Sequence, residues 1–256
     1  MLLNLIVLEL CAMAAMLGIE RLWGSVPRGG SRWLNMQIWA VYMVAAFVAQ
    51  PLLAALAIGA TNRFGVFLVD LATVPFIWGF IAFALAMDLA EYAFHRAQHR
   101  IPVLWRMHSL HHSDRHMDAT TTLRHFWADP ILKGLTVYPL VGLVLKPTPD
   151  MILVYALLGL LNLLFHSSLP IGWGRFSFLL NSPAYHRVHH SVDQADYNIN
   201  FAALFPIFDV IFRTYRQPMH SPQTGLDIAP DTIVAATLWP LRARKFASDA
   251  GLRETA

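Results

Sequence analysis

Three histidine-rich motifs constrain this chain more than any other feature, because their side chains must come together in the fold. Eight of the twelve histidines lie in these motifs. They are HxxxH at residues 95–99, HxxHH at residues 108–112 and a second HxxHH at residues 186–190. Residues three and four apart share one face of a helix, with Cβ atoms roughly 5 to 6 Å apart. Each motif therefore aims at least two imidazoles at a common point.

This spacing predicts a metal centre held by imidazole. One tetrahedral or octahedral ion cannot take eight such ligands, so the sequence predicts two metal ions. Imidazole suits iron, zinc, copper and nickel, and the motifs alone leave the choice open. The predicted ligands are His95, His99, His108, His111, His112, His186, His189 and His190.

The composition is that of a membrane protein. Apolar residues make up 56% of the chain and charged residues only 14%, against roughly 25% charged in soluble domains. The net charge of +3 is small and the basic residues are spread along the chain, which argues against nucleic-acid binding. The single cysteine, Cys11, has no partner for a disulfide framework and provides no Cys-based metal site.

Long apolar stretches predict membrane-spanning helices, since about 20 apolar residues cross a bilayer. A shorter helical hairpin, whose arms are residues 131–145 and 151–168, follows the second motif. We expect the third long span to continue without a break into the first histidine motif. The three long spans are residues 2–19, 33–60 and 66–94.

The basic residues predict which side of the membrane holds the histidines. Residues 96–133 are polar and basic, and helix counting puts the loop with Arg21, Arg28 and Arg32 on the same side. The positive-inside rule makes this side cytoplasmic. The sequence thus predicts an all-α integral membrane bundle, multi-pass, with three long N-terminal spans, a shorter hairpin and a cytoplasmic histidine-rich cap.

Two later segments carry weaker patterns. Residues 200–215 are Phe-rich and amphipathic, and we expect them at the membrane interface near the site. Residues 228–241 predict a short amphipathic helix. We divide the chain into an N-terminal transmembrane hairpin region (1–64), a catalytic domain (65–216) and a tail (217–256) without an assigned role.

Other polar residues are placed to support the metal centre. His166 and Asn162 form a polar pair at helical spacing in an apolar helix, which makes His166 a ninth candidate ligand. Asp88 precedes His95 by seven residues on the same helix face, where it either accepts a hydrogen bond from a ligand imidazole or solvates a helix end. Asn162, and Asp193 beyond the last motif, are further candidates for such support.

Several metal-site classes are excluded. A carboxylate-bridged di-iron bundle needs several glutamates, including paired Glu-x-x-His motifs, and this chain has no such pair. The zinc-protease HExxH helix and a Gly-rich nucleotide loop are also missing from the sequence. The only glutamates are Glu9, Glu20, Glu91 and Glu254.

With these motifs on a multi-span chain, the sequence resembles the fatty acid hydroxylase and sterol desaturase superfamily of membrane di-iron oxygenases. The resemblance implies that the eight motif histidines bind two irons, with His166 contributing. It also implies that O2 attacks an unactivated C–H bond of a lipid, by hydroxylation in preference to desaturation, with electrons from a separate ferredoxin-, cytochrome- or reductase-type donor. The matching parts are residues 95–99, 105–113, 122–124, 165–167, 186–193, 200–201 and 208–215.

One departure from the family pattern concerns a further histidine. Many members have a histidine two residues after the Leu-Arg pair, followed by proline and an acid. Here that position is Phe126, while His125 stands beside Arg124 and Asp129 takes the place of the acid. His125 is therefore an additional candidate ligand that stands outside the three motifs.

Two other functions remain open at this point. A two-zinc membrane hydrolase would use zinc-bound water, with Glu91 or Asp193 as the carboxylate base. A non-enzymatic metal-binding or transport protein is the second alternative. Transporters place their ligands near the bilayer midplane, whereas these histidines lie mostly beyond the apolar spans.

Overall fold

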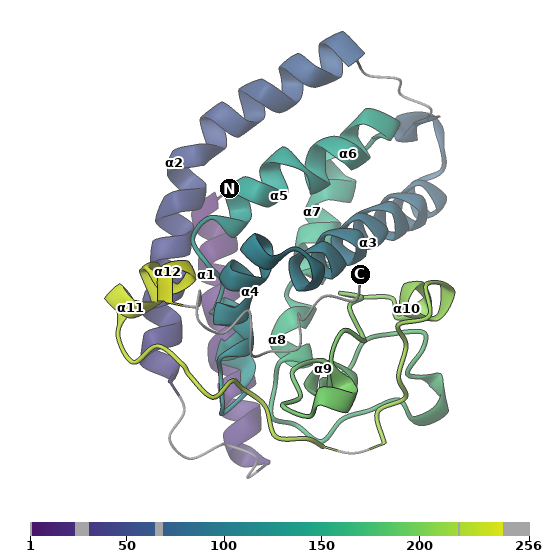
Figure 1. The fold of residues 1–256 in the computed structure, drawn as a ribbon. Coiled ribbons are helices and arrows are strands. Elements are labelled where there is room, and N and C mark those ends of the chain that lie inside the picture. Colours follow the sequence, from purple (N-terminus) through teal and green to yellow (C-terminus); the bar gives the residue numbers. More distant parts are fainter. Residues whose placement is uncertain (1, 24–30, 65–68, 220, 243–256) are drawn as a thin grey trace.

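The computed structural model describes residues 2–23, 31–64, 69–219 and 221–242, and the described chain is mostly helical (Figure 1). The three longest helices are α1 (Leu2–Leu22), α2 (Arg32–Phe64) and α3 (Phe76–Arg100). The shorter α-helices are α4 (Pro102–His112), α5 (Asp129–Leu135), α6 (Val137–Val144), α7 (Pro149–Leu158), α8 (Leu161–Phe165), α9 (Pro183–His189), α10 (Ile207–Ile211), α11 (Ile233–Thr237) and α12 (Trp239–Arg242).

Two of the described helices are long and apolar enough to cross a membrane. They are Arg32–Gly59 within α2 and Phe76–Arg100, which is α3. Helix α2 exposes large apolar side chains along its length, including Phe47 and Val48. The predicted first span forms α1, but α1 is not one of these two candidates. Arg28, used in the topology prediction, lies outside the described residues.

Helix α3 carries the first histidine motif without a break, as the sequence predicts. Its predicted start at residue 66 is wrong, because Pro75 precedes the first helical residue. Strand β1 (Val69–Asp70) and the 3-10 helix η1 (Leu71–Thr73) lie before it, and Asp70 caps η1 by accepting from the Ala72 amide. The long helix thus ends with two ligand candidates one turn apart.

The expectation of an all-α chain needs a small correction. Strand β1 pairs in parallel with β2 (Leu145–Lys146), so that Val69 faces Leu145. The Lys146 ammonium lies 2.9 Å from an Asp70 carboxylate oxygen. This two-stranded contact fixes the turn of the helical hairpin against the start of α3.

Both arms of the predicted hairpin are interrupted. The first arm begins at Asp129 and divides at Thr136 into α5 and α6, since Pro139 has no N–H to donate to the Leu135 carbonyl four residues earlier. The second arm divides at Gly159 into α7 and α8. An apolar core between α3 and the hairpin includes Phe83, Val137 and Met151.

A buried arginine in the segment after α4 ties helix α2 to helix α4. Arg124, 1% exposed, donates through Nε to the Leu110 carbonyl at 3.0 Å, and through Nη1 to Ser31 Oγ and Asn35 Oδ1. Its Nε and Nη2 also reach Ser113 Oγ. One guanidinium therefore binds Leu110 in α4 and Asn35 in α2 at the same time, so the position of α4 depends on α2.

The C-terminal predictions are met in part. Of residues 200–215 only α10 is an α-helix; the chain turns through left-handed conformations at Asn200 and Arg213, and Phe201 is buried against histidine rings. The predicted helix at residues 228–241 appears as α11 and α12. Trp239 Nε1 donates to Ser109 Oγ, which docks α12 on α4. Residues 243–256 lie outside the description.

Candidate metal centre

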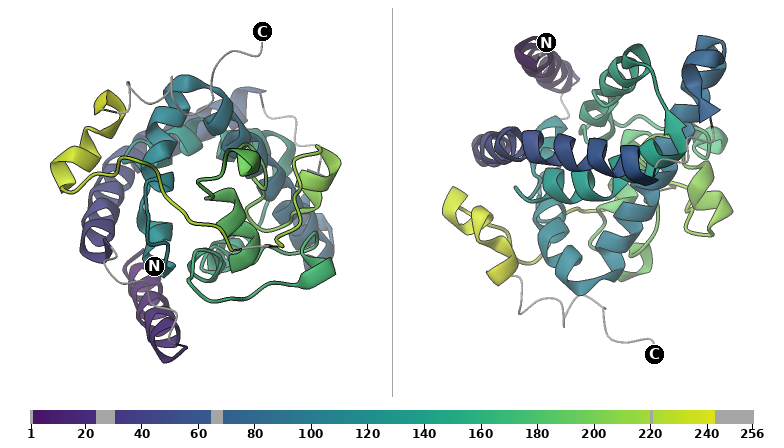
Figure 2. Two further views of the ribbon diagram at one scale, coloured as in Figure 1. Left: turned by 60° about the horizontal axis from the view of Figure 1, so that its bottom comes forward. Right: turned by 90° about the horizontal axis from the view of Figure 1, so that it is seen from above.

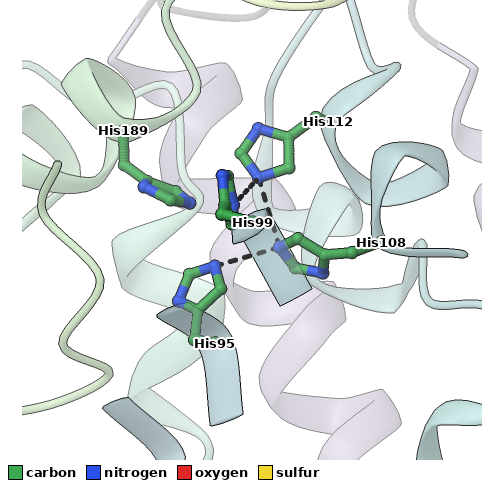
Figure 3. Close-up of side chains that lie close together, drawn as sticks. All are labelled: His95, His99, His108, His112 and His189. Carbon is green, nitrogen blue, oxygen red and sulfur yellow. Dashed lines mark hydrogen bonds between the residues drawn. The ribbon is translucent and has the colours of Figure 1, made fainter. Parts of the chain in front are cut away.

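Nine imidazoles come together in two groups, and within each group the ligand atoms lie within 4.8 Å of one another. Eight of the nine are the motif histidines, and the ninth is His166. The first group is His95, His99, His108, His112 and His189, drawn in Figure 3. The second group is His111, His166, His186 and His190.

Short helices aim these side chains inward. Helix α4 begins with Pro102 at its first position, and α9 begins with Pro183 after Ser182, whose hydroxyl caps the Tyr185 amide. Both devices fix where a helix starts. In each HxxHH motif the first and last histidines, four residues apart, join one group, and the middle histidine joins the other.

Adjacent Nε2 atoms in the first group lie at hydrogen-bond distance. His108 Nε2 is 2.9 Å from His95 Nε2 and 3.2 Å from His112 Nε2, and His99 Nε2 is 3.1 Å from His112 Nε2. Figure 3 shows these contacts as dashed lines, with His189 approaching from the other side. The His189 ring centre is 4.5 Å from that of His95.

The second group repeats this pattern. His166 Nε2 lies 3.1 Å from His111 Nε2 and 2.9 Å from His186 Nε2. His190 Nε2 is 3.2 Å from His186 Nε2. The two groups adjoin, because the rings of His112 and His190 stack with centres 4.3 Å apart.

Backbone carbonyls determine the tautomer of three rings. The Nδ1 atoms of His95 and His189 each lie 2.7 Å from a carbonyl oxygen, and His166 Nδ1 lies 2.8 Å from one. A carbonyl only accepts, so Nδ1 carries the proton and Nε2 of the neutral ring presents its lone pair to the group. The acceptors are the carbonyls of Phe201, Ile199 and Asn162, respectively.

Converging lone pairs fit a cation at each group. His189 Nε2 is buried and has no hydrogen-bond partner among the described residues. A metal ion takes imidazole lone pairs as ligands, with the second nitrogen bonded to a carbonyl or carboxylate. The donor set is entirely imidazole nitrogen, which suits iron, zinc, copper or nickel.

The surroundings keep these rings neutral. Burial, followed by neighbouring histidines, lowers the pKa of His108, His112 and His186 well below the usual value. Burial also lowers the pKa of His189 to about 4, opposed by its bond to the Ile199 carbonyl. Neutral imidazole is the form that binds metal.

Two buried aspartates hold the segment that supplies the carbonyl for His95. Asp209 accepts from the amides of Phe201 and Ala202, both at 2.8 Å, and from the hydroxyl of Tyr185 at 2.5 Å. The Thr214 hydroxyl is its fourth donor. Sequence analysis gave Asp209 no role at the site, although an acid within the apolar, Phe-rich segment was a signal for one.

Asp88 supports the site differently from the sequence prediction. Its carboxylate oxygens accept from the amides of Leu204 and Phe205, each at 2.8 Å. The acceptor for His95 is the Phe201 carbonyl instead. Asp88 thus binds one end of segment 201–205 to α3 through two amides, and it acts on His95 through the backbone of this segment.

Asn162 and Asp193, the other two residues predicted to support the metal centre, also make contacts other than those predicted. Asn162 supplies its backbone carbonyl to His166, while its side chain donates to the Gly159 carbonyl. Asp193 is exposed and accepts from the Ala195 amide, which caps the 3-10 helix η4 (Gln194–Asp196). Asp193 therefore holds the loop after the motif.

His125 lies beside the centre but belongs to neither group of described ligands. Its ring stacks on His111 with centres 4.6 Å apart and planes 11° apart. Its Nδ1 is 3.3 Å from an Asp129 oxygen. The one-residue shift from the family position thus leaves His125 packed against a ligand candidate.

A pocket leads from the histidines to the surface. Its volume is about 490 Å³, including its open mouth. His99, His112, His189 and His190 form its inner end. Small molecules can therefore approach both groups from one side.

Comparisons with known proteins agree with these observations. Human alkylglycerol monooxygenase is 30% identical over 153 residues, which cover 58% of this chain and 33% of the relative. An ornithine lipid hydroxylase of Rhizobium tropici is 30% identical over 148 residues, covering 56% and 44%. This chain thus spans less than half the length of these relatives, and no solved structure matches it.

The family comparison covers more than half of the chain. The model of the fatty acid hydroxylase family matches residues 80–214, a range that contains all nine grouped histidines. Together with the two candidate membrane helices, this match indicates a membrane protein. The chain belongs to the fatty acid hydroxylase family.

Proposed function

We propose that this chain is a membrane-bound di-iron oxygenase that hydroxylates an unactivated C–H bond of a lipid. The observation that carries the proposal is the convergence of nine buried imidazoles in two adjoining groups. The family supports oxygenation, and the relatives are named for the oxidation of lipids. We assign the eight motif histidines and His166 as iron ligands, one iron to each group.

Iron held by these nine imidazoles would supply the chemistry that activates O2 toward an unactivated C–H bond. In the overall reaction one oxygen atom enters the lipid and the other leaves as water, which consumes two electrons and two protons. We propose that a separate donor of ferredoxin, cytochrome or reductase type supplies these electrons.

We place the site at the cytoplasmic face of a multi-pass protein. Helices α2 and α3 are the candidate spans, and we infer that α1 and the α5–α8 hairpin also enter the bilayer. Basic residues near the histidine end of α3, including Arg96, Arg100 and Arg106, favour the cytoplasmic side. The lipid substrate then comes from the bilayer.

The structure weakens the case for a two-zinc hydrolase. Its two candidate bases are occupied elsewhere: Glu91 lies 2.7 Å from the Lys133 ammonium, and Asp193 caps a loop. Neither group of described ligands contains a carboxylate. A non-enzymatic metal carrier would leave the pocket at the histidines without a role.

Isotope labelling tests the proposal. Iron-loaded protein in nanodiscs receives a ferredoxin with its reductase, and membrane lipid extract is the substrate. We expect a lipid product that carries one oxygen atom from labelled O2. The variant His111→Ala should form none, whereas His116→Ala, which changes a histidine outside both groups, should act as the wild type does. Product oxygen derived from labelled water would instead indicate hydrolysis.

A further inference from the structure

A segment beyond the family match lies across the metal centre. Residues 221–228, called the strap here, follow the matched range 80–214. In Figure 1 this yellow-green segment runs along the bottom of the molecule, below α8 and α9, toward α11. The left view of Figure 2 brings it forward, in front of the rest of the chain. Within the described part of the tail, the strap is the segment that lines the histidine pocket.

Backbone hydrogen bonds attach the strap to the last histidine motif. Thr224 forms an antiparallel bridge with Ser191, the residue after His190. The Val192 amide donates to the Gln223 carbonyl at 3.0 Å. The strap is therefore held next to the residues that build both metal groups.

Arg115, which lies three residues after the second histidine motif, also holds the strap. Its guanidinium donates to the Leu226 carbonyl at 3.0 Å and to the Asp227 carbonyl. Gly225 has a φ of +108°, and a Cβ there would lie 2.7 Å from Arg115 Cγ and 2.8 Å from its Cα. Only glycine lets the strap approach so closely, which places Leu226 at the pocket.

The strap supplies part of the pocket wall. Gly225 and Leu226 line the pocket together with Trp105, whose ring centre is 4.8 Å from that of His99. Ser191, Tyr197 and Asn198 add neutral polar groups. Among these described lining residues there is no carboxylate, ammonium or guanidinium. These lining side chains therefore offer no ionic partner to a charged ligand group that loses its hydration in the pocket.

We propose that the strap is the outer wall of the substrate pocket, and that Leu226 limits the size of what reaches the irons. The pocket admits an uncharged part of the lipid, such as an alkyl chain with its neutral hydroxyl or ether groups. This inference rests on the proposed function, because it takes the two groups as iron sites.

Iron removal by chelators tests the wall without measuring catalysis. Iron-loaded wild type, Leu226→Ala and Leu226→Trp are mixed with 2,2′-bipyridine, which is uncharged, and iron loss is followed by absorbance. We expect several-fold faster loss in Leu226→Ala and slower loss in Leu226→Trp. Ile228→Ala, an exposed strap position that does not line the pocket, serves as the matched control and should match the wild type.

The tryptophan variant separates this result from misfolding, because a loosened fold would release iron faster. Equal rates in wild type and both Leu226 variants would overturn the role of the strap. Wild-type protein that binds no iron would instead overturn the proposed function, and with it this inference.

A second chelator tests the charge preference. Ferrozine is anionic and binds ferrous iron as bipyridine does. Each chelator's rate of iron removal from the protein is divided by its rate with free iron. For the wild type, this normalised rate should be several-fold lower for ferrozine than for bipyridine. In Leu226→Lys the gap between the two normalised rates should be smaller. Equal relative rates in the wild type would overturn the assignment of an uncharged pocket.

Discussion

His111 and His189 hold equivalent positions in the two HxxHH motifs, and each joins the group built by the other motif. His189 lies with the α4 pair His108 and His112, while His111 lies with the α9 pair His186 and His190. Each proposed iron therefore needs both α4 and α9. The two sites are expected to assemble together.

Asp209 is predicted to be essential for the first group. Asp209→Ala would leave four buried donors without their acceptor, which costs about 1 to 3 kcal/mol for a buried unsatisfied group. We expect a lower midpoint of thermal unfolding and reduced iron content, because the Phe201 carbonyl would move from His95. Asp231→Ala, at an exposed position, is the control; equal iron content in both variants would contradict the role.

Arg124 should not tolerate lysine. A lysine ammonium cannot reach Leu110, Ser31 and Asn35 with the geometry of the guanidinium. We expect Arg124→Lys to lower the free energy of unfolding by about 1 to 3 kcal/mol, measured by denaturant titration in detergent. Arg100→Lys, at the exposed end of α3, should change it little. Similar free energies of unfolding for the wild type and Arg124→Lys would show that the buried network is dispensable.

The variants His125→Ala and His166→Ala should differ in iron content. His166 Nε2 lies within the second group, whereas His125 stacks on His111 from outside. His125→Ala should therefore retain the wild-type iron content, and His166→Ala should lose iron. Elemental analysis of the purified variants measures both. Loss of a whole iron in His125→Ala would make it a ligand.

The metal-free protein should become less stable in mild acid. Histidines in the unfolded chain take up protons near pH 6.5, whereas the folded chain does so at His189 only near pH 4. Unfolding therefore binds protons in this window, and its free energy falls as the pH falls from about 6.5 toward about 4. Thermal unfolding of chelator-treated protein at several pH values measures this. A constant midpoint across the window would contradict the burial of neutral imidazoles.

Spacing alone predicted much of the site. The pairs four residues apart, such as His95 with His99 and His186 with His190, share a group because helices place them on one face. Spacing could not assign the middle histidines, because their destination depends on how α4 and α9 pack. The apolar lengths predicted α2 and the continuity of α3 into its histidines.

The remaining features depend on long-range contacts that have no local signal. Asp88 acts through segment 201–205, more than a hundred residues away in sequence. The strap is aligned by Arg115 through backbone carbonyls, which leave no residue pattern. The division of the first hairpin arm was the exception, since Pro139 was visible in the sequence.

Iron stoichiometry tests the two-metal account most directly. Protein expressed with ample iron is purified in detergent and analysed for metals, together with His111→Ala, His189→Ala and the control His116→Ala. The account predicts about two irons per chain in the wild type and in the control, and a clear loss in both ligand variants. Full iron content in both His111→Ala and His189→Ala, or two tightly bound zinc ions with no iron, would contradict it.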